Sequence, residues 1–234
     1  MENTTGTGRQ LSRRTAIGYG GAIAAAIGGT RLPRAAAAQQ SGATPASPAP
    51  STWEEIDNRL ASIAPATALL AAELIDDEIV PVHAYNPDLV LPIGSSYKLW
   101  ILGTLAMQVE EGTLDWEQIV EIEDRYRSVP GGDLRYVTAG SPFTMRYLAE
   151  RMIQKSDNTA TDHMLHLAGR ENVEAALTAM GVADPALNVP LLSTRELAML
   201  KFACTTEEVD AYIAASVDER RRILAEEVAA IPYE

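Results

Sequence analysis

The chain has 234 residues, of which 47% are apolar and 22% charged, which suits one globular domain or a domain with an additional tail. Acidic residues outnumber basic ones by 32 to 19, which gives a formal net charge of −13 at pH 7. This acidic excess repels nucleic acid and anionic membrane surfaces, so neither is expected as a partner. The single cysteine, Cys204, excludes an intrachain disulfide, and its apolar neighbours predict a buried structural thiol.

Residues 1–38 have the features of an export signal. Residues 12–17 (SRRTAI) resemble the twin-arginine pattern, and an apolar Gly/Ala-rich stretch over 16–29 and a small-residue cleavage site at 36–38 follow. We therefore expect a protein that folds before export and works outside the cytoplasmic membrane, in the periplasm or secreted, with no stable membrane span after processing. An uncleaved transmembrane anchor is the alternative, although the apolar stretch is short for one.

Residues 39–51 (QQSGATPASPAPS) predict a disordered linker, so the folded domain is expected over 52–234. Apolar residues at helical spacing, after a possible cap at Thr52, predict a helix over 53–63. Two short apolar runs, 66–74 and 79–85, flank an acidic turn and suggest a β-hairpin, with a helix as the alternative for the first run.

The rest of the chain is predicted to be mainly helical. Apolar periodicity indicates helices over 95–110, 144–155, 159–168 and 171–180, whereas 128–133 must form a loop and 115–124 is ambiguous. Capping-box patterns predict three further helix starts, at Ser193, Thr205 and Ser216. The fold class expected from these elements is α+β, dominated by helices.

Ser95 and Lys98 form a Ser-x-x-Lys pattern at the start of the predicted helix over 95–110. Residues three apart lie one turn apart on a helix, so an amine is placed beside a hydroxyl that could become a nucleophile. Chance matches to this pattern are common, and a helix start with a surface lysine is the alternative. Ser96 is a poorer nucleophile candidate, because it lies only two residues before Lys98 and faces elsewhere.

A second motif, Ser156-Asp157-Asn158, stands between two predicted helices, where it could also be an ordinary helix cap. Together, the two motifs resemble the first two of three motifs of the penicillin-recognising serine hydrolases, and the chain resembles a class A β-lactamase-related enzyme from about residue 66 to about residue 201.

This resemblance implies a β-lactamase/transpeptidase-like fold for residues 52–234 and assigns roles to the motif residues. Ser95 would be the acylated nucleophile and Lys98 the base that takes its proton. Ser156 would relay a proton to the leaving nitrogen, and Asn158 would bind the amide of the substrate. The implied enzyme is an exported serine hydrolase that opens an amide or ester, such as a β-lactam, with a role in β-lactam breakdown and antibiotic resistance.

The chain departs from the family pattern in three places. The third motif, Lys-[Ser/Thr]-Gly, is absent, and the water-activating Glu-x-x-Leu-Asn motif has only a weak echo, Asp184-Pro185-Ala186-Leu187-Asn188. Asp184 is thus a weak candidate for the deacylating acid, with an Asp-Pro turn as the alternative. The chain also ends before the last strands of the family, so we expect a fold truncated at its C-terminus, with strands of the sheet missing.

Two other functions remain open. One is a non-catalytic or truncated penicillin-recognising module, and the other is an enzyme similar to a D-alanyl-D-alanine peptidase. The expected partner is a small molecule: a β-lactam, an ester or a peptidoglycan peptide. We expect no cofactor and no metal, because His163 and His166 lack a suitably placed third ligand and are predicted to be surface residues.

Overall fold

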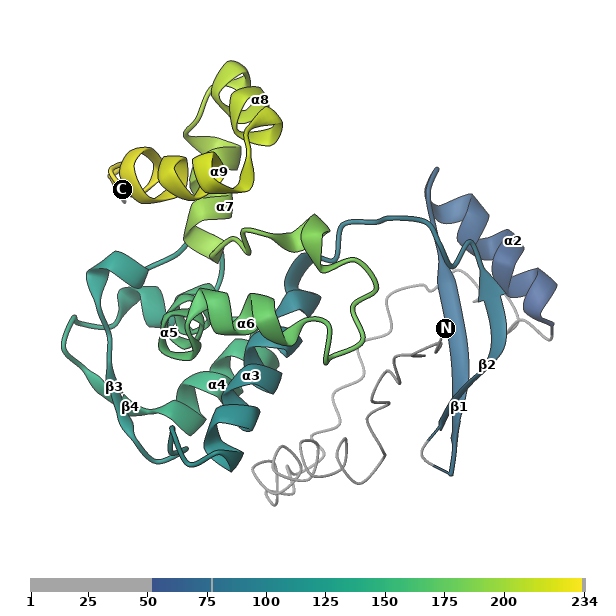
Figure 1. The fold of residues 1–234 in the computed structure, drawn as a ribbon, viewed down its shortest axis with the longest axis horizontal. Helices are drawn as coiled ribbons and strands as arrows, with labels where there is room; N and C mark the ends of the chain where they lie inside the picture. Colours follow the sequence, from purple (N-terminus) through teal and green to yellow (C-terminus); the bar gives the residue numbers. More distant parts are fainter. Residues whose placement is uncertain (1–51, 77, 233–234) are drawn as a thin grey trace, which may run out of the picture. The chain divides into compact units, whose positions relative to one another are not determined.

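The computed structural model describes residues 52–76 and 78–232, so the predicted signal over 1–38 and linker over 39–51 lie outside the described residues. The chain divides into two compact units between Ile93 and Gly94, each of which is described by itself (Figure 1). None of the helices in the described ranges has the length and apolar character of a membrane span. The domain boundaries predicted from the sequence stay predictions.

The first unit contains one helix and one antiparallel hairpin. The helix α2 (Trp53–Ile63) precedes the strands β1 (Leu69–Ile75) and β2 (Glu78–Tyr85), which pair with each other. The register shifts between Ala71 and Ala72, where Ala72 pairs with Pro81 of β2. The predicted hairpin is confirmed, and the helical alternative for its first run is wrong.

Side-chain contacts join α2 to the hairpin. Thr52 caps the helix by accepting a hydrogen bond from the backbone N–H of Glu55 at 3.2 Å. The ring of His83 on β2 stacks on Trp53, with ring centroids 4.5 Å apart, and its Nε2 lies 2.8 Å from the Asp57 carboxylate. His83 therefore connects the strand to the helix.

Many large apolar side chains of the hairpin are exposed to solvent. Within residues 52–76 and 78–232 this sheet has two strands, so each strand is also an edge of the sheet on one side. The exposed side chains are Leu70, Leu74, Ile75, Ile79, Val80 and Val82.

The second unit is helical and is built around α5 (Asn158–Ala168), which packs against several other helices. Its neighbours include α3 (Lys98–Glu110), α4 (Met145–Gln154) and α6 (Arg170–Ala176). A 3₁₀ turn, η1 (Gly94–Tyr97), leads directly into α3. The predicted helices over 95–110, 144–155 and 159–168 are therefore confirmed.

Two short strands accompany these helices. The strands β3 (Ile119–Glu121) and β4 (Pro142–Thr144) pair antiparallel beside them (Figure 1). The 3₁₀ turns η2 (Asp124–Tyr126) and η3 (Leu134–Tyr136) lie between the strands in the chain. The predicted loop over 128–133 is confirmed, and β3 lies in the stretch whose pattern was ambiguous.

The C-terminal part of this unit consists of short elements with well-defined starts: η4 (Pro185–Asn188), α7 (Thr194–Phe202), α8 (Thr206–Ala214), α9 (Val217–Ile223) and the π-helical turn η5 (Leu224–Val228). Ser193, Thr205 and Ser216 each accept a hydrogen bond from the backbone N–H three residues on, so all three predicted helix starts are confirmed. A buried apolar cluster joins α7, α8 and η5.

Two expectations for this unit need correction. The helix α6 ends at Ala176 rather than Met180, because the chain turns toward Gly181, which has a left-handed φ of 81°. Cys204 is only partly buried, because it follows the end of α7, where the chain turns and Phe202 is exposed. The fold class is α+β and helix-dominated, as predicted.

Candidate active site

Lys98, the first residue of α3, lies at the centre of a polar cluster although only 2% of its surface is exposed. An ammonium group has three N–H donors, and three acceptors surround this one. They are the carbonyl oxygen of Ser156 at 2.9 Å, the Ser156 Oγ at 2.9 Å and the Asn158 Oδ1 at 2.8 Å. The fold thus joins the lysine of the first motif to the serine and asparagine of the second.

The joint between α4 and α5 has the backbone conformation that this cluster requires. Ser156 has a φ of 52°, in the left-handed region that non-glycine residues rarely adopt. The next residue, Asp157, caps α5 by accepting a hydrogen bond from the backbone N–H of Ala160 at 2.9 Å. The chain therefore reverses at Ser156, whose carbonyl and hydroxyl oxygens both bind Lys98.

The loop over 128–133 is held against this joint. Asp157 is fully buried and accepts a second backbone hydrogen bond, from Leu134 at 3.1 Å. A side chain on Gly132 would overlap the Asp157 carboxylate. The amide nitrogen of Asn158 donates to the carbonyl oxygen of Pro130, which leaves its oxygen directed at Lys98.

Arg127 fastens the other end of the same loop. Its guanidinium donates to the carbonyl oxygens of Arg135 and Val137, each at 2.6 Å, and its Nε donates to Asp124 at 2.6 Å. A planar guanidinium can satisfy several acceptors in fixed directions. Arg127 therefore holds η3 in place, next to the Asp157 contact at Leu134.

Burial lowers the pKa of Lys98, and the negative charges of Asp162 and Asp157 act in the opposite direction. A lysine with a lowered pKa can lose its proton more easily and accept one from a neighbouring hydroxyl. The arrangement can therefore combine a base, a proton-relaying hydroxyl and an amide for substrate binding in one cluster.

Ser95 lies in η1, three residues before Lys98, and its side chain is exposed. Among the described residues, the three acceptors of the Lys98 ammonium come from Ser156 and Asn158 and not from Ser95. The structure thus brings together three of the four residues selected from the motifs. The fourth, Ser95, lies at the surface where a solvent-borne substrate can reach it.

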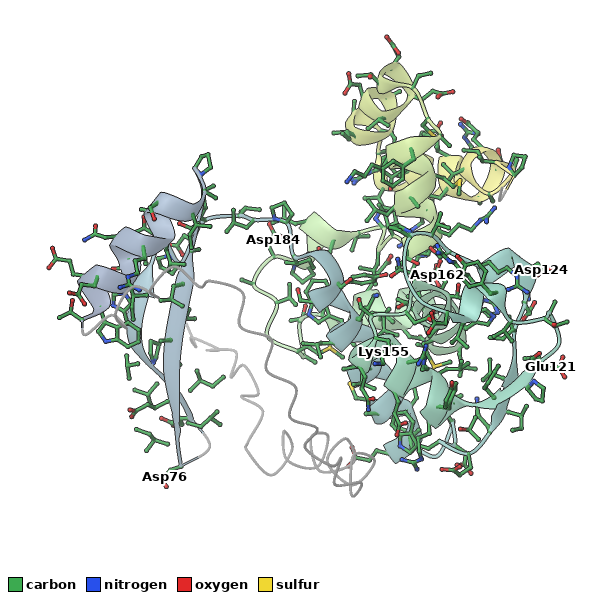
Figure 2. The ribbon with its side chains drawn as sticks, turned by 180° about the vertical axis from the view of Figure 1, so that it is seen from behind. Asp76, Glu121, Asp124, Lys155, Asp162 and Asp184 are labelled. Atoms are coloured by element: carbon green, nitrogen blue, oxygen red, sulfur yellow. The ribbon has the colours of Figure 1, made fainter. Side chains whose placement is uncertain are left out.

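Asp184 is exposed at the start of η4 (Figure 2). One of its carboxylate oxygens accepts a hydrogen bond from the backbone N–H of Ala186 at 3.2 Å, which caps this short turn. The local structure is thus the Asp-Pro turn considered above, and a deacylating role for Asp184 stays a prediction.

His163 is buried, so its expected surface position is wrong, whereas His166 is exposed as expected. The His163 Nδ1 lies 2.7 Å from the carbonyl oxygen of Thr159, and the His163 Nε2 accepts a hydrogen bond from the backbone N–H of Glu123 at 2.8 Å. Partners from two distant segments enclose the ring, which sequence spacing could not show. No group of three or more potential metal ligands occurs within residues 52–76 and 78–232.

Asp162, Thr194 and Ser128 form a buried polar group that sequence reasoning did not select as functional. The Thr194 hydroxyl lies 2.7 Å from both the Asp162 carboxylate and the Ser128 hydroxyl. Only the capping-box pattern at Ser193 signalled that a helix starts here. Nothing in that pattern indicated that Asp162, 32 residues before Thr194, faces the same helix start.

A model of the β-lactamase enzyme family matches residues 51–230. The chain belongs to this family. The match covers both motifs of the Lys98 cluster and most of the described residues. No curated protein matches the chain significantly.

Solved structures of β-lactamases and of PBP-A are similar to parts of the chain. A β-lactamase from Sphaerobacter thermophilus is 20% identical, with a TM-score of 0.49, and the match covers 57% of this chain and 50% of that one. PBP-A is 23% identical, with a TM-score of 0.48, over 74% of this chain and 66% of that one. A β-lactamase from Chitinophaga pinensis is 18% identical, with a TM-score of 0.48, over 74% and 67%. The chain therefore spans about half to two thirds of these structures.

Proposed function

We propose that this family member is a serine hydrolase that forms an acyl-enzyme at Ser95. The observation that carries the proposal is the buried Lys98, which contacts Ser156 and Asn158. Once Lys98 has lost a proton, its amine takes the hydroxyl proton of Ser95 while Oγ bonds to the carbonyl carbon of the substrate. Ser156 supplies a proton to the leaving nitrogen as the amide bond breaks, and Lys98 returns a proton to Ser156.

The proposed substrate is a β-lactam, with a peptidoglycan peptide or a small ester as related acyl donors. In a related structure, a mutant of PBP-A is an acyl-enzyme complex with penicillin G. Asn158 would bind the side-chain amide of such a substrate, because amide groups pair with each other through one donor and one acceptor. Hydrolysis of a β-lactam would give the protein a role in antibiotic resistance.

Labelling with a fluorescent penicillin tests this function. The full chain should be labelled covalently, and mass spectrometry should place the adduct on the peptide that contains Ser95. Ser95→Ala and Lys98→Met should lose labelling by at least about a hundredfold, because nucleophile and base are both needed. Ser96→Ala is the matched control and should keep it. Wild-type protein that labels no more than Ser95→Ala would exclude the proposed function.

A second candidate is a penicillin-binding protein that is acylated but releases the product slowly, as a peptidase-like relative would do with penicillin. The exposed position of Asp184 and its use as a cap favour this candidate over rapid hydrolysis. In the same assay, a label that persists for hours after removal of free probe supports slow release. A label that decays within seconds supports a β-lactamase.

We further propose that the protein is exported by the twin-arginine route and works in the periplasm or outside the cell. The proposal rests on residues 1–38, with the paired Arg13 and Arg14 before an apolar stretch. A reporter fused to this segment should be exported, and replacing both arginines by lysine should abolish export. Export that is unchanged in the lysine variant contradicts the twin-arginine route.

A further inference from the structure

Asp162 is a buried carboxylate on the same helix as the motif asparagine. It lies four residues after Asn158 in α5, so both side chains lie on one face of the helix, a turn apart. Asn158 binds the Lys98 ammonium at 2.8 Å, and Asp162 is only 3% exposed. Figure 2 shows Asp162 within the helical unit. The mechanism proposed above does not use this carboxylate.

The start of α7 surrounds the Asp162 carboxylate. The carboxylate accepts hydrogen bonds from the backbone N–H groups of Thr194 at 2.7 Å and Arg195 at 2.9 Å, and the Thr194 hydroxyl lies 2.7 Å from it. The same hydroxyl lies 3.1 Å from the carbonyl oxygen of Asn158. One hydroxyl thus connects Asp162 to the residue that holds Lys98.

Charged and titratable groups from several elements act on Asp162 or respond to its charge. Burial raises the pKa of Asp162 to about 7, the hydrogen bonds from Thr194 and Arg195 oppose this shift, and Glu196 supports it. From η1, Tyr97 has a pKa raised by burial and then by the charges of Asp162 and Glu196, while Arg170 lowers it. From α3, Lys98 has a pKa that burial lowers, and the charges of Asp162 and then of Asp157 raise it.

Solvent protons have a route to Asp162. A cavity of about 760 Å³ lies on the side of α5 that faces α6 and η5, and Asp162 forms part of its wall. His166, Arg170 and Val228 also line it. The carboxylate can therefore exchange protons with solvent although its surface is almost fully covered.

We propose that Asp162 is a positioning residue that sets the protonation state of Lys98, an inference that rests on the proposed function. An ionised Asp162 favours the ammonium form of Lys98, and a protonated Asp162 favours the free amine that can accept the proton of Ser95. The rate of acylation should then depend on the titration of both groups, which are coupled.

The pH dependence of labelling tests this role. For the full chain, the second-order rate constant for labelling by fluorescent penicillin should rise with pH as Lys98 loses its proton. In Asp162→Asn, the midpoint of this rise should move to lower pH by about 0.5 to 1 unit, because the negative charge is gone. Thr194→Val keeps the Asp162 carboxylate but removes a hydrogen bond that stabilises its ionised form. In this variant the midpoint should also move to lower pH, by less than in Asp162→Asn.

Asp133→Asn is the matched control, because it removes the same charge from an exposed side chain that pairs with Arg151. Its midpoint should equal that of the wild type. A rate that falls equally at every pH in Asp162→Asn, with an unchanged midpoint, would show a merely structural role and overturn the proposal. If Asp162→Asn does not fold, an unchanged midpoint in Thr194→Val has the same meaning.

A second measurement does not depend on acylation. In a double-mutant cycle, the unfolding free energies of Asp162→Asn, Lys98→Met and the double variant should show coupling at pH 8 that weakens at pH 5, where Asp162 is protonated. Absence of coupling at pH 8 overturns the proposal even if the protein is never labelled. Absence of labelling in wild type, with coupling present, instead rejects the proposed function.

Discussion

At the scale of single residues, the Lys98 cluster depends on backbone conformations that few residues adopt easily. Ser156 has a φ of 52° and Gly132 a φ of 83°. For a residue with a Cβ, the left-handed region costs about 1–2 kcal/mol. Ser156 bears this cost, and its two oxygens bind Lys98. At Gly132 the absence of a side chain also leaves room for the Asp157 carboxylate.

We predict that Gly132→Ala strongly destabilises the second unit. The added methyl group would displace the buried Asp157 from Ala160 and Leu134, at a cost of about 1–3 kcal/mol per unsatisfied group in addition to the backbone cost. Thermal or urea unfolding measures the change, and penicillin labelling should slow in parallel.

Gly131→Ala is the control for this prediction. Gly131 also has a left-handed φ, of 92°, but an added methyl group would meet no atom within 4 Å. The variant should lose only the backbone contribution, about 1–2 kcal/mol. Equal losses in the two variants would mean that contact with Asp157 is unimportant.

Part of this site could be predicted at the residue scale. Ser95, Lys98 and Asn158 belong to short motifs whose spacing is visible in the sequence. Asp162 and Thr194 could not be selected, because their contact joins two helices that are separated by a long stretch of chain. Only folding brings such residues together.

At the scale of elements, local signals determined which helices could be predicted. The helices α7, α8 and α9 begin where a serine or threonine side chain satisfies a free backbone N–H, a requirement that leaves a pattern in the sequence. The three-residue strands β3 and β4 were missed, because three residues are too few to establish an alternating pattern. Their pairing also depends on a long intervening loop.

That loop leads to a prediction at this scale. Arg127→Lys should loosen the segment over 128–137, because a lysine cannot replace the directed hydrogen bonds to Arg135 and Val137. Limited proteolysis should cut this segment faster in the variant, and penicillin labelling should slow. Arg125→Lys, at an exposed neighbouring arginine, should be cleaved as slowly as the wild type. Equal cleavage of both variants would contradict the role of Arg127 in holding this segment.

At the scale of the whole molecule, two buried groups in adjacent positions make stability depend on pH in opposite directions. Burial lowers the pKa of His163 in the folded protein below its value in the unfolded chain, about 6.5. The contribution of neutral His163 to the free energy of unfolding is therefore complete above about pH 6.5 and is lost as the pH falls below it. The raised pKa of Asp162, about 7, has the reverse effect. The contribution of protonated Asp162 to the free energy of unfolding is complete below about pH 4, the pKa of an unfolded aspartate, and is lost as the pH rises toward about 7.

We therefore predict that the free energy of unfolding falls less in His163→Gln than in the wild type as the pH is lowered below about 6.5, because the variant lacks the group that must stay neutral. Asp162→Asn should make the same loss steeper, since it removes the opposing contribution. Urea unfolding at several pH values measures both slopes. His166→Gln, at an exposed position, should keep most of the wild-type slope. A His163→Gln slope equal to that of the wild type would contradict this account.

The exposed apolar side chains of β1 and β2 affect how the protein behaves in concentrated solution. A hairpin with two edge strands can pair with that of another molecule, and the acidic excess of the chain, −13 over the full sequence, opposes such pairing by mutual repulsion. Such repulsion acts over about 10 Å at 0.1 M salt and over about 3 Å at 1 M. The colloidal stability of this protein should therefore depend on ionic strength, so that the protein resists association best in dilute buffer and associates more readily as salt is added.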